Sequence, residues 1–148
     1  MIDDLYSDRI LRLAANMPRA GRLADPDGTA EKTAKLCGSR IVVDIRLENG
    51  RVVDFAQEVK ACALGQAAAA VLGANVIGAS VAEITTGRDE LRAMLKAGGP
   101  APTGRFADLA VLRPVREFPP RHASTKLAFE ATVAAIDAAL AQAPREVA

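Results

Sequence analysis

Two cysteines are the residues of this chain best suited to chemistry. Cys37 lies in a bend, Leu36-Cys37-Gly38-Ser39, that leads into a strand pattern, and Cys62 ends a second strand and opens an alanine-rich helix. A helix N-terminus carries partial positive charge and unpaired N–H groups, which favour an anionic thiolate or an anionic ligand. With one histidine and no tryptophan among 148 residues, the chain has few other places for such chemistry.

The spacing of Cys37 and Cys62 does not define a site by itself. It matches none of the C-x-x-C patterns of zinc or ferredoxin sites. Free cysteine is among the most buried residue types, so two buried structural thiols explain the spacing as well as a reactive pair does.

Composition excludes some classes of partner. The chain has 19 basic and 18 acidic residues, a balance that gives no strong field for nucleic acid or a membrane. The N-terminus is acidic, without the apolar core of a signal peptide, and no 18-residue apolar run is present. We therefore expect one cytoplasmic domain over residues 1–148, with no nucleic-acid or membrane partner and with cysteines that are free thiols or ligands.

The first part of the chain has one helical pattern and then strand patterns. Ser7 is a suitable N-cap for a helix that Pro18 ends, and residues 19–29 form a connector. Asn49-Gly50 suits a hairpin turn, but a strict two-residue loop would put the apolar side chains of the flanking strands on opposite faces. We expect a bulge or a longer loop there, and the register stays open. The predicted strands are Glu31–Leu36, Arg40–Leu47 and Arg51–Lys60.

The remainder of the chain is helical in pattern. Ser80-Val81-Ala82-Glu83 is a capping box, and it opens a helix that we expect to end near Gly87. Strands followed by helices indicate an α+β fold, with a small antiparallel three-stranded sheet packed against several helices and a long C-terminal helix. The other predicted helices are 63–72, 88–96, 104–112 and 124–141.

Several segments resemble the U-type iron–sulfur cluster scaffold family, which includes IscU, SufU and the N-terminal domain of NifU. They are Asn16–Leu23, Cys37-Gly38 and Ala61–Ala69, in that order. Arg113–His122, followed by Leu127–Phe129, is similar to the family's third-ligand region, and the long segment before it resembles that of SufU. The chaperone-recognition motif of IscU is replaced here by Glu-Phe-Pro-Pro-Arg.

The resemblance implies a domain that accepts sulfur from a cysteine desulfurase, holds iron or a nascent [2Fe–2S] cluster, or zinc, and passes the cluster to acceptor apo-proteins. Family members use three cysteines with an aspartate or histidine. Cys37 and Cys62 match the first two cysteines, and Cys62 is the expected sulfur acceptor. Ser124 occupies the third cysteine's position, and Ser39 replaces the aspartate that usually follows Cys-Gly.

These departures weaken the expected metal site. Thiolates bind iron and zinc strongly, whereas neutral serine hydroxyls are poor ligands. Two thiolates with His122 would leave one open position, so His122 is a candidate ligand and Ser39 and Ser124 are weaker ones. Each has a structural alternative, as a surface histidine, a turn residue and a helix N-cap. We expect labile metal binding or a metal-free protein.

The expected role is a scaffold or carrier rather than an enzyme. One alternative is a thiol sulfurtransferase or sulfur carrier that assembles no cluster. Another is a non-catalytic paralogue that docks to a cysteine desulfurase and regulates it.

Overall fold

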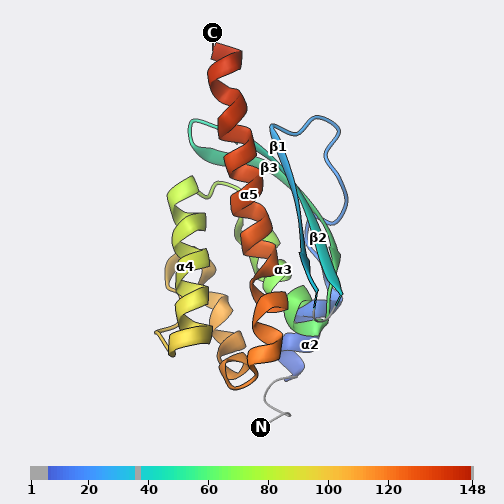
Figure 1. The fold of residues 1–148 in the computed structure, drawn as a ribbon, viewed down its shortest axis with the longest axis vertical. Helices are drawn as coiled ribbons and strands as arrows, with labels where there is room; N and C mark the ends of the chain where they lie inside the picture. Colours follow the sequence, from blue (N-terminus) through green and yellow to red (C-terminus); the bar gives the residue numbers. More distant parts are fainter. Residues whose placement is uncertain (1–6, 36–37, 148) are drawn as a thin grey trace.

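The computed structural model describes residues 7–35 and 38–147, which form one antiparallel sheet with helices against one face (Figure 1). The strands follow the order β1-β2-β3, and the long C-terminal helix confirms the α+β fold that the sequence predicted. The strands are β1 (Gly28–Ala34), β2 (Ser39–Glu48) and β3 (Arg51–Lys60). The helices are α2 (Asp8–Ala15), α3 (Ala63–Asn75), α4 (Val81–Ala97), α5 (His122–Val147) and the 3₁₀ helices η1 (Gly104–Glu117) and η2 (Pro119–Arg121).

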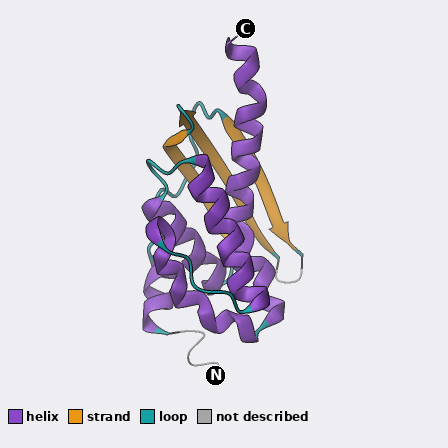
Figure 2. Cartoon of the chain, turned by 90° about the vertical axis from the view of Figure 1, so that its left-hand side faces the viewer, coloured by secondary structure: helices purple, strands orange, loops and turns teal. Residues whose placement is uncertain are grey.

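The helices form two layers on the sheet. Helix α5 lies across β1 and β2, and α3 packs beside it against β3, as Figure 1 and Figure 2 show from two sides. Helix α4 packs on α5 and η1, farther from the strands. Nine of the 13 residues of α3 are buried, so this alanine-rich helix is the centre of the core.

The hairpin between β2 and β3 has the bulge that its sequence requires. Asn49 and Gly50 both have positive φ, at 53° and 74°, as a tight turn demands. Ile45 pairs with Phe55, but the register shifts between Arg46 and Leu47. The shift confirms the expected bulge, which lets both strands direct apolar side chains to the helices.

The prediction that one helix ends near Gly87 and another begins at residue 88 is wrong, because α4 is a single helix. It begins at the capping box that Ser80 and Glu83 form, as expected, and then runs without a break to Ala97. Gly87 is buried, and a Cβ there would lie 2.9 Å from Phe106 Cδ2 and 3.4 Å from Phe129 Cε2. This glycine therefore permits close packing and does not end the helix.

The start of α5 and of β2 corrects two further expectations. Helix α5 begins at His122, directly after the Pro-Pro turn of η2, so Ser124 lies inside the helix and is not its N-cap. Ser39 is not a turn residue, because it is the first residue of β2 and is buried.

The connector after α2 wraps around the outer edge of β3. The Gln57 backbone N–H donates to Arg19 O at 3.0 Å, and Gly21 N–H donates to Gln57 O at 2.9 Å. The Gln57 side chain lies on the helix side, where Nε2 donates to Ala69 O of α3 and to Pro18 O. Residues 18–21 thus pass from the helix side to the strand edge.

The same connector then crosses to the other face of the sheet, where it binds Asp44. This carboxylate is fully buried and accepts hydrogen bonds from Arg22 Nε at 2.6 Å, Thr29 Oγ1 at 2.6 Å and Leu23 N–H at 3.0 Å. Burial by itself would raise the pKa of Asp44, but these hydrogen bonds outweigh it and hold the pKa below its ordinary value. Asp44 therefore binds the connector in its ionised, carboxylate form.

Candidate functional site

Cys62 lies at the N-terminus of α3, where the sequence predicted it. The residue is the N-cap, with φ −67° and ψ 171°, and its carbonyl accepts the Gln66 N–H at 2.9 Å. Its side chain makes no capping hydrogen bond to the helix and is half-buried. The thiol is therefore directed to a neighbour other than the free amides of its own helix.

That neighbour is Ser124. The distance from Cys62 Sγ to Ser124 Oγ is 3.0 Å, across 62 residues of sequence. Ser124 is 1% exposed, although the Cys62 side chain reaches the surface. The structure therefore brings Cys62 into contact with Ser124, the residue that the family resemblance placed at the position of the third cysteine.

Close packing of α3 against α5 makes this contact. A Cβ on Gly65 would lie 3.0 Å from Ser124 O and 3.2 Å from Ser124 Oγ, so a larger residue would separate the two helices here. Sequence analysis did not single out Gly65. One feature of the sequence could have identified it. A glycine inside a helix costs about 1 kcal/mol relative to alanine, so a glycine in an alanine-rich helix indicates that close packing requires it.

The C-terminal ends of β1 and β3 and the N-terminal end of β2 lie at the same end of the sheet. Ala34 at the end of β1 pairs with Ser39, and Arg40 pairs with Lys60, two residues before Cys62. Ser39 is 2% exposed at this end. Cys37, the other predicted site cysteine, lies outside the described residues.

His122 is engaged elsewhere in the structure. Its Nε2 lies 3.0 Å from Val115 O and 3.2 Å from Arg116 O, so this nitrogen acts as a donor to the backbone of η1. Metal binding through Nε2 would require these hydrogen bonds to break. The proposed ligand role of His122 stays a prediction, whereas Cys62 and Ser124 are already side by side.

The described residues supply only part of a metal-binding donor set. Among them, no group of three or more His, Cys, Asp or Glu side chains could hold a metal ion. Cys62 offers one soft sulfur donor, and Ser124 offers a hydroxyl that is a weak ligand unless it loses its proton. Cys62 and Ser124 alone would therefore hold a metal ion weakly, and a stable site would need a further thiolate. In the described part of the chain, no helix combines the length and apolar character needed to cross a bilayer.

The chain is similar to known proteins in both sequence and fold. Residues 5–125 match the model of the NifU-like N terminal domain family. The chain is 27% identical over 117 residues to the iron-sulfur cluster assembly scaffold protein IscU of Thermotoga maritima. The aligned region covers 79% of this chain and 82% of that relative.

Two solved structures have the same fold. The N-terminal NifU-like protein of Brucella abortus has a TM-score of 0.94 and 50% identity, and the match covers 95% of this chain and 98% of that one. A putative scaffold protein for the SUF system of Fervidobacterium islandicum has a TM-score of 0.83 and 19% identity, covering 90% and 98%.

Proposed function

The chain belongs to the NifU-like N-terminal domain family of iron–sulfur cluster assembly scaffolds, and on that premise we propose that Cys62 accepts sulfur and helps to hold a nascent [2Fe–2S] cluster. The observation that carries the proposal is the 3.0 Å contact between Cys62 Sγ and Ser124 Oγ. It joins a half-exposed thiol at a helix N-terminus to the position where related scaffolds carry a third cysteine.

The sulfur step is a thiol exchange. The Cys62 thiolate attacks the outer sulfur of a persulfide on a cysteine desulfurase, the donor's S–S bond breaks, and the donor leaves as a thiolate. The product is a persulfide on Cys62, and no external oxidant or reductant is needed for this transfer. A half-buried thiol suits the step, because the attacking sulfur must reach a partner while its own helix stays folded.

The cargo would be iron or a [2Fe–2S] cluster, with zinc as a competing ion. Cys37 and Cys62 would supply the thiolates, and Ser124 would supply a weaker oxygen donor. His122 and Ser39 remain candidate ligands of lower rank. Because fewer thiolates hold the metal than in relatives with three cysteines, release to an acceptor apo-protein would be easy.

Anaerobic reconstitution tests the proposal. The purified protein is given ferric iron and sulfide, which supply both elements at the oxidation levels of an oxidised [2Fe–2S] cluster. We expect visible absorption from the cluster, which Cys62→Ala abolishes. Incubation with a cysteine desulfurase and cysteine should yield a trappable persulfide on Cys62. Cys62→Ser is the fold control, since a hydroxyl keeps a polar partner for Ser124, and its melting temperature should match that of the wild type.

The alternatives give different results in the same assays. A sulfur carrier would form the persulfide without the chromophore. A docking paralogue would form neither, but it would change the rate of the desulfurase. Absence of both chromophore and persulfide in the wild type would overturn the proposed scaffold.

A further inference from the structure

A hollow of about 540 Å³ opens between α4, η1, η2 and the first turns of α5. Its lining is rich in positive charge, although the whole chain is almost neutral. Four of the lining residues are cationic and one is a carboxylate: Arg92, Lys96, Arg116, Lys126 and Glu117. They come from three separate helices, so the charges converge because of the fold and do not follow from one run of sequence.

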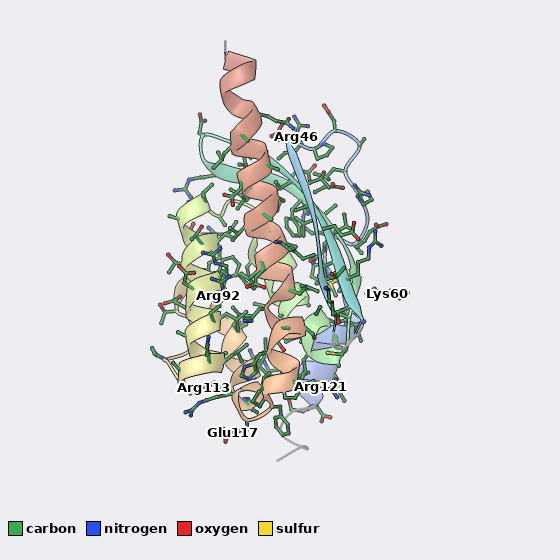
Figure 3. All side chains as sticks on the ribbon, in the orientation of Figure 1. Arg46, Lys60, Arg92, Arg113, Glu117 and Arg121 are labelled. Carbon is green, nitrogen blue, oxygen red and sulfur yellow. The ribbon has the colours of Figure 1, made fainter. Side chains whose placement is uncertain are left out.

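Most of this positive charge has no ion-pair partner among the described residues. Arg92 is paired with Glu130, whose Oε2 lies 2.7 Å from Arg92 Nη2. Within residues 7–35 and 38–142, whose side chains the structure describes, Lys96, Arg116 and Lys126 form no ion pair. Among the described residues, three cations of the lining and one carboxylate, that of Glu117, therefore have no ion-pair partner. Figure 3 labels Arg92 on α4 and Glu117 at the end of η1.

The walls of the hollow are fixed by packing. Arg116 lies against Gly98, the left-handed C-cap of α4, where an added Cβ would be 2.6 Å from the guanidinium carbon. Leu95, which also lines the hollow, is 1% exposed. The His122 ring is held by its hydrogen bonds to η1 carbonyls. The wall of the hollow is therefore formed before a ligand binds, so the entropic cost of binding falls mainly on the exposed cationic side chains.

We propose that this hollow binds a small phosphate-bearing anion. Its volume lies in the range of about 300–1,000 Å³ that is usual for small-molecule sites. A guanidinium binds phosphate oxygens in a fork, and the two ammonium groups of Lys96 and Lys126 add point charges from the facing helices. The inference does not depend on the proposed scaffold role, because neither Cys62 nor Ser124 is among the residues that line the hollow.

Calorimetric titration of the metal-free protein with inorganic pyrophosphate, in about 0.15 M salt, tests this site. We expect saturable binding of one pyrophosphate per chain. The Lys96→Ala/Lys126→Ala double variant should bind about tenfold more weakly or worse, because two charges are lost close to the ligand. Glu117→Gln should bind pyrophosphate more tightly, since it removes the carboxylate from the lining of the hollow. A misfolded variant would lose affinity, so a gain in affinity cannot result from misfolding.

The matched control is Arg46→Ala/Lys60→Ala, which removes the same charge from exposed positions on β2 and β3, both labelled in Figure 3. Its affinity should equal that of the wild type. An equal loss in both double variants would show diffuse attraction and overturn the site. So would failure to saturate with millimolar pyrophosphate, or binding of an acidic peptide in its place, which would indicate a protein partner.

Discussion

Gly65 lies so close to Ser124 of α5 and to Ala61 that an added Cβ would force its neighbours to shift. A Cβ on Gly65 would be 3.0 Å from the Ser124 carbonyl oxygen, and Ser124 Oγ is itself 3.0 Å from Cys62 Sγ. The glycine therefore determines the distance between the two side chains of the candidate site, although it has no chemistry of its own.

Gly65→Ala should separate Cys62 from Ser124 and weaken cluster formation more than it weakens the fold. We expect a loss of about 1–3 kcal/mol in unfolding free energy, as for overpacking, together with reduced visible absorption after reconstitution. Gln66→Ala, at the next and half-buried position, is the control and should form the chromophore normally. Normal reconstitution of Gly65→Ala would show that the spacing of the helices does not matter to the site.

Ser124→Cys should strengthen metal binding, because it restores a third sulfur donor beside Cys62. The expected gain in affinity for zinc or iron is at least about 10–100-fold, the range that changes in ligand support produce. The measurement is a competition with a chromophoric chelator under reducing conditions, which keep the two adjacent thiols from forming a disulfide.

Ala123→Cys is the matched control for that variant. It adds a thiol one residue earlier, at an exposed position about 100° around the helix. If both variants gained affinity equally, any added thiol would serve, and the position of Ser124 would have no special role.

Asp44→Asn should destabilise the fold in a way that depends on pH. Breaking a buried and hydrogen-bonded ion pair costs about 3–5 kcal/mol, and we expect about 2–4 here, because Arg22 is half-exposed. Since the folded-state pKa of Asp44 is lowered, its contribution is present above the unfolded pKa of about 3.9 and is lost as pH falls through the folded value.

Urea denaturation of wild type and Asp44→Asn at several pH values checks this prediction. The difference in unfolding free energy should be constant near neutral pH and shrink below about pH 4. Glu58→Gln removes the weaker partner of the same arginine, 4.0 Å away and exposed, and should change stability by less than about 1 kcal/mol. A difference that persists unchanged in strong acid would contradict the charged state assigned to Asp44.

Gly87→Ala tests whether this glycine permits packing. An added Cβ meets the Phe106 ring, which stands edge-to-face with Phe129 at a centroid distance of 5.2 Å. Overpacking should cost about 1–3 kcal/mol, offset in part by about 1 kcal/mol of better helix propensity. Thr86→Ala, exposed on the same helix, should leave the melting temperature nearly unchanged or raise it.

Local signals in the sequence predicted much of the fold. The capping box of Ser80, the turn at Asn49-Gly50 and the cap position of Cys62 each depend on only a few neighbouring residues. The bulge followed from a conflict between turn length and the apolar faces of the strands. These features are fixed by chain geometry, so residue type and spacing are sufficient to indicate them.

Long-range contacts account for what the sequence did not indicate. Gly87 looks like a helix end until Phe106 is placed against it. Ser124 looks like an N-cap from its sequence, but α5 begins two residues earlier, and Ser124 contacts Cys62 on another helix. The cationic hollow joins side chains from α4, η1 and α5 whose spacing along the chain follows no motif. Such relationships depend on how helices pack, and one sequence read locally carries little of that information.

The connector around β3 also bears on solubility. A bare strand edge is a template for pairing with another molecule, and the β3 edge is occupied at both ends, by Gln57 bonded to residues 19 and 21 and by Val52 bonded to residues 78 and 79. A local opening that released the connector would bare this edge and its apolar strand. We therefore expect variants that loosen the contacts of Asp44 with this connector to aggregate at temperatures well below global unfolding, because they expose the outer edge of β3.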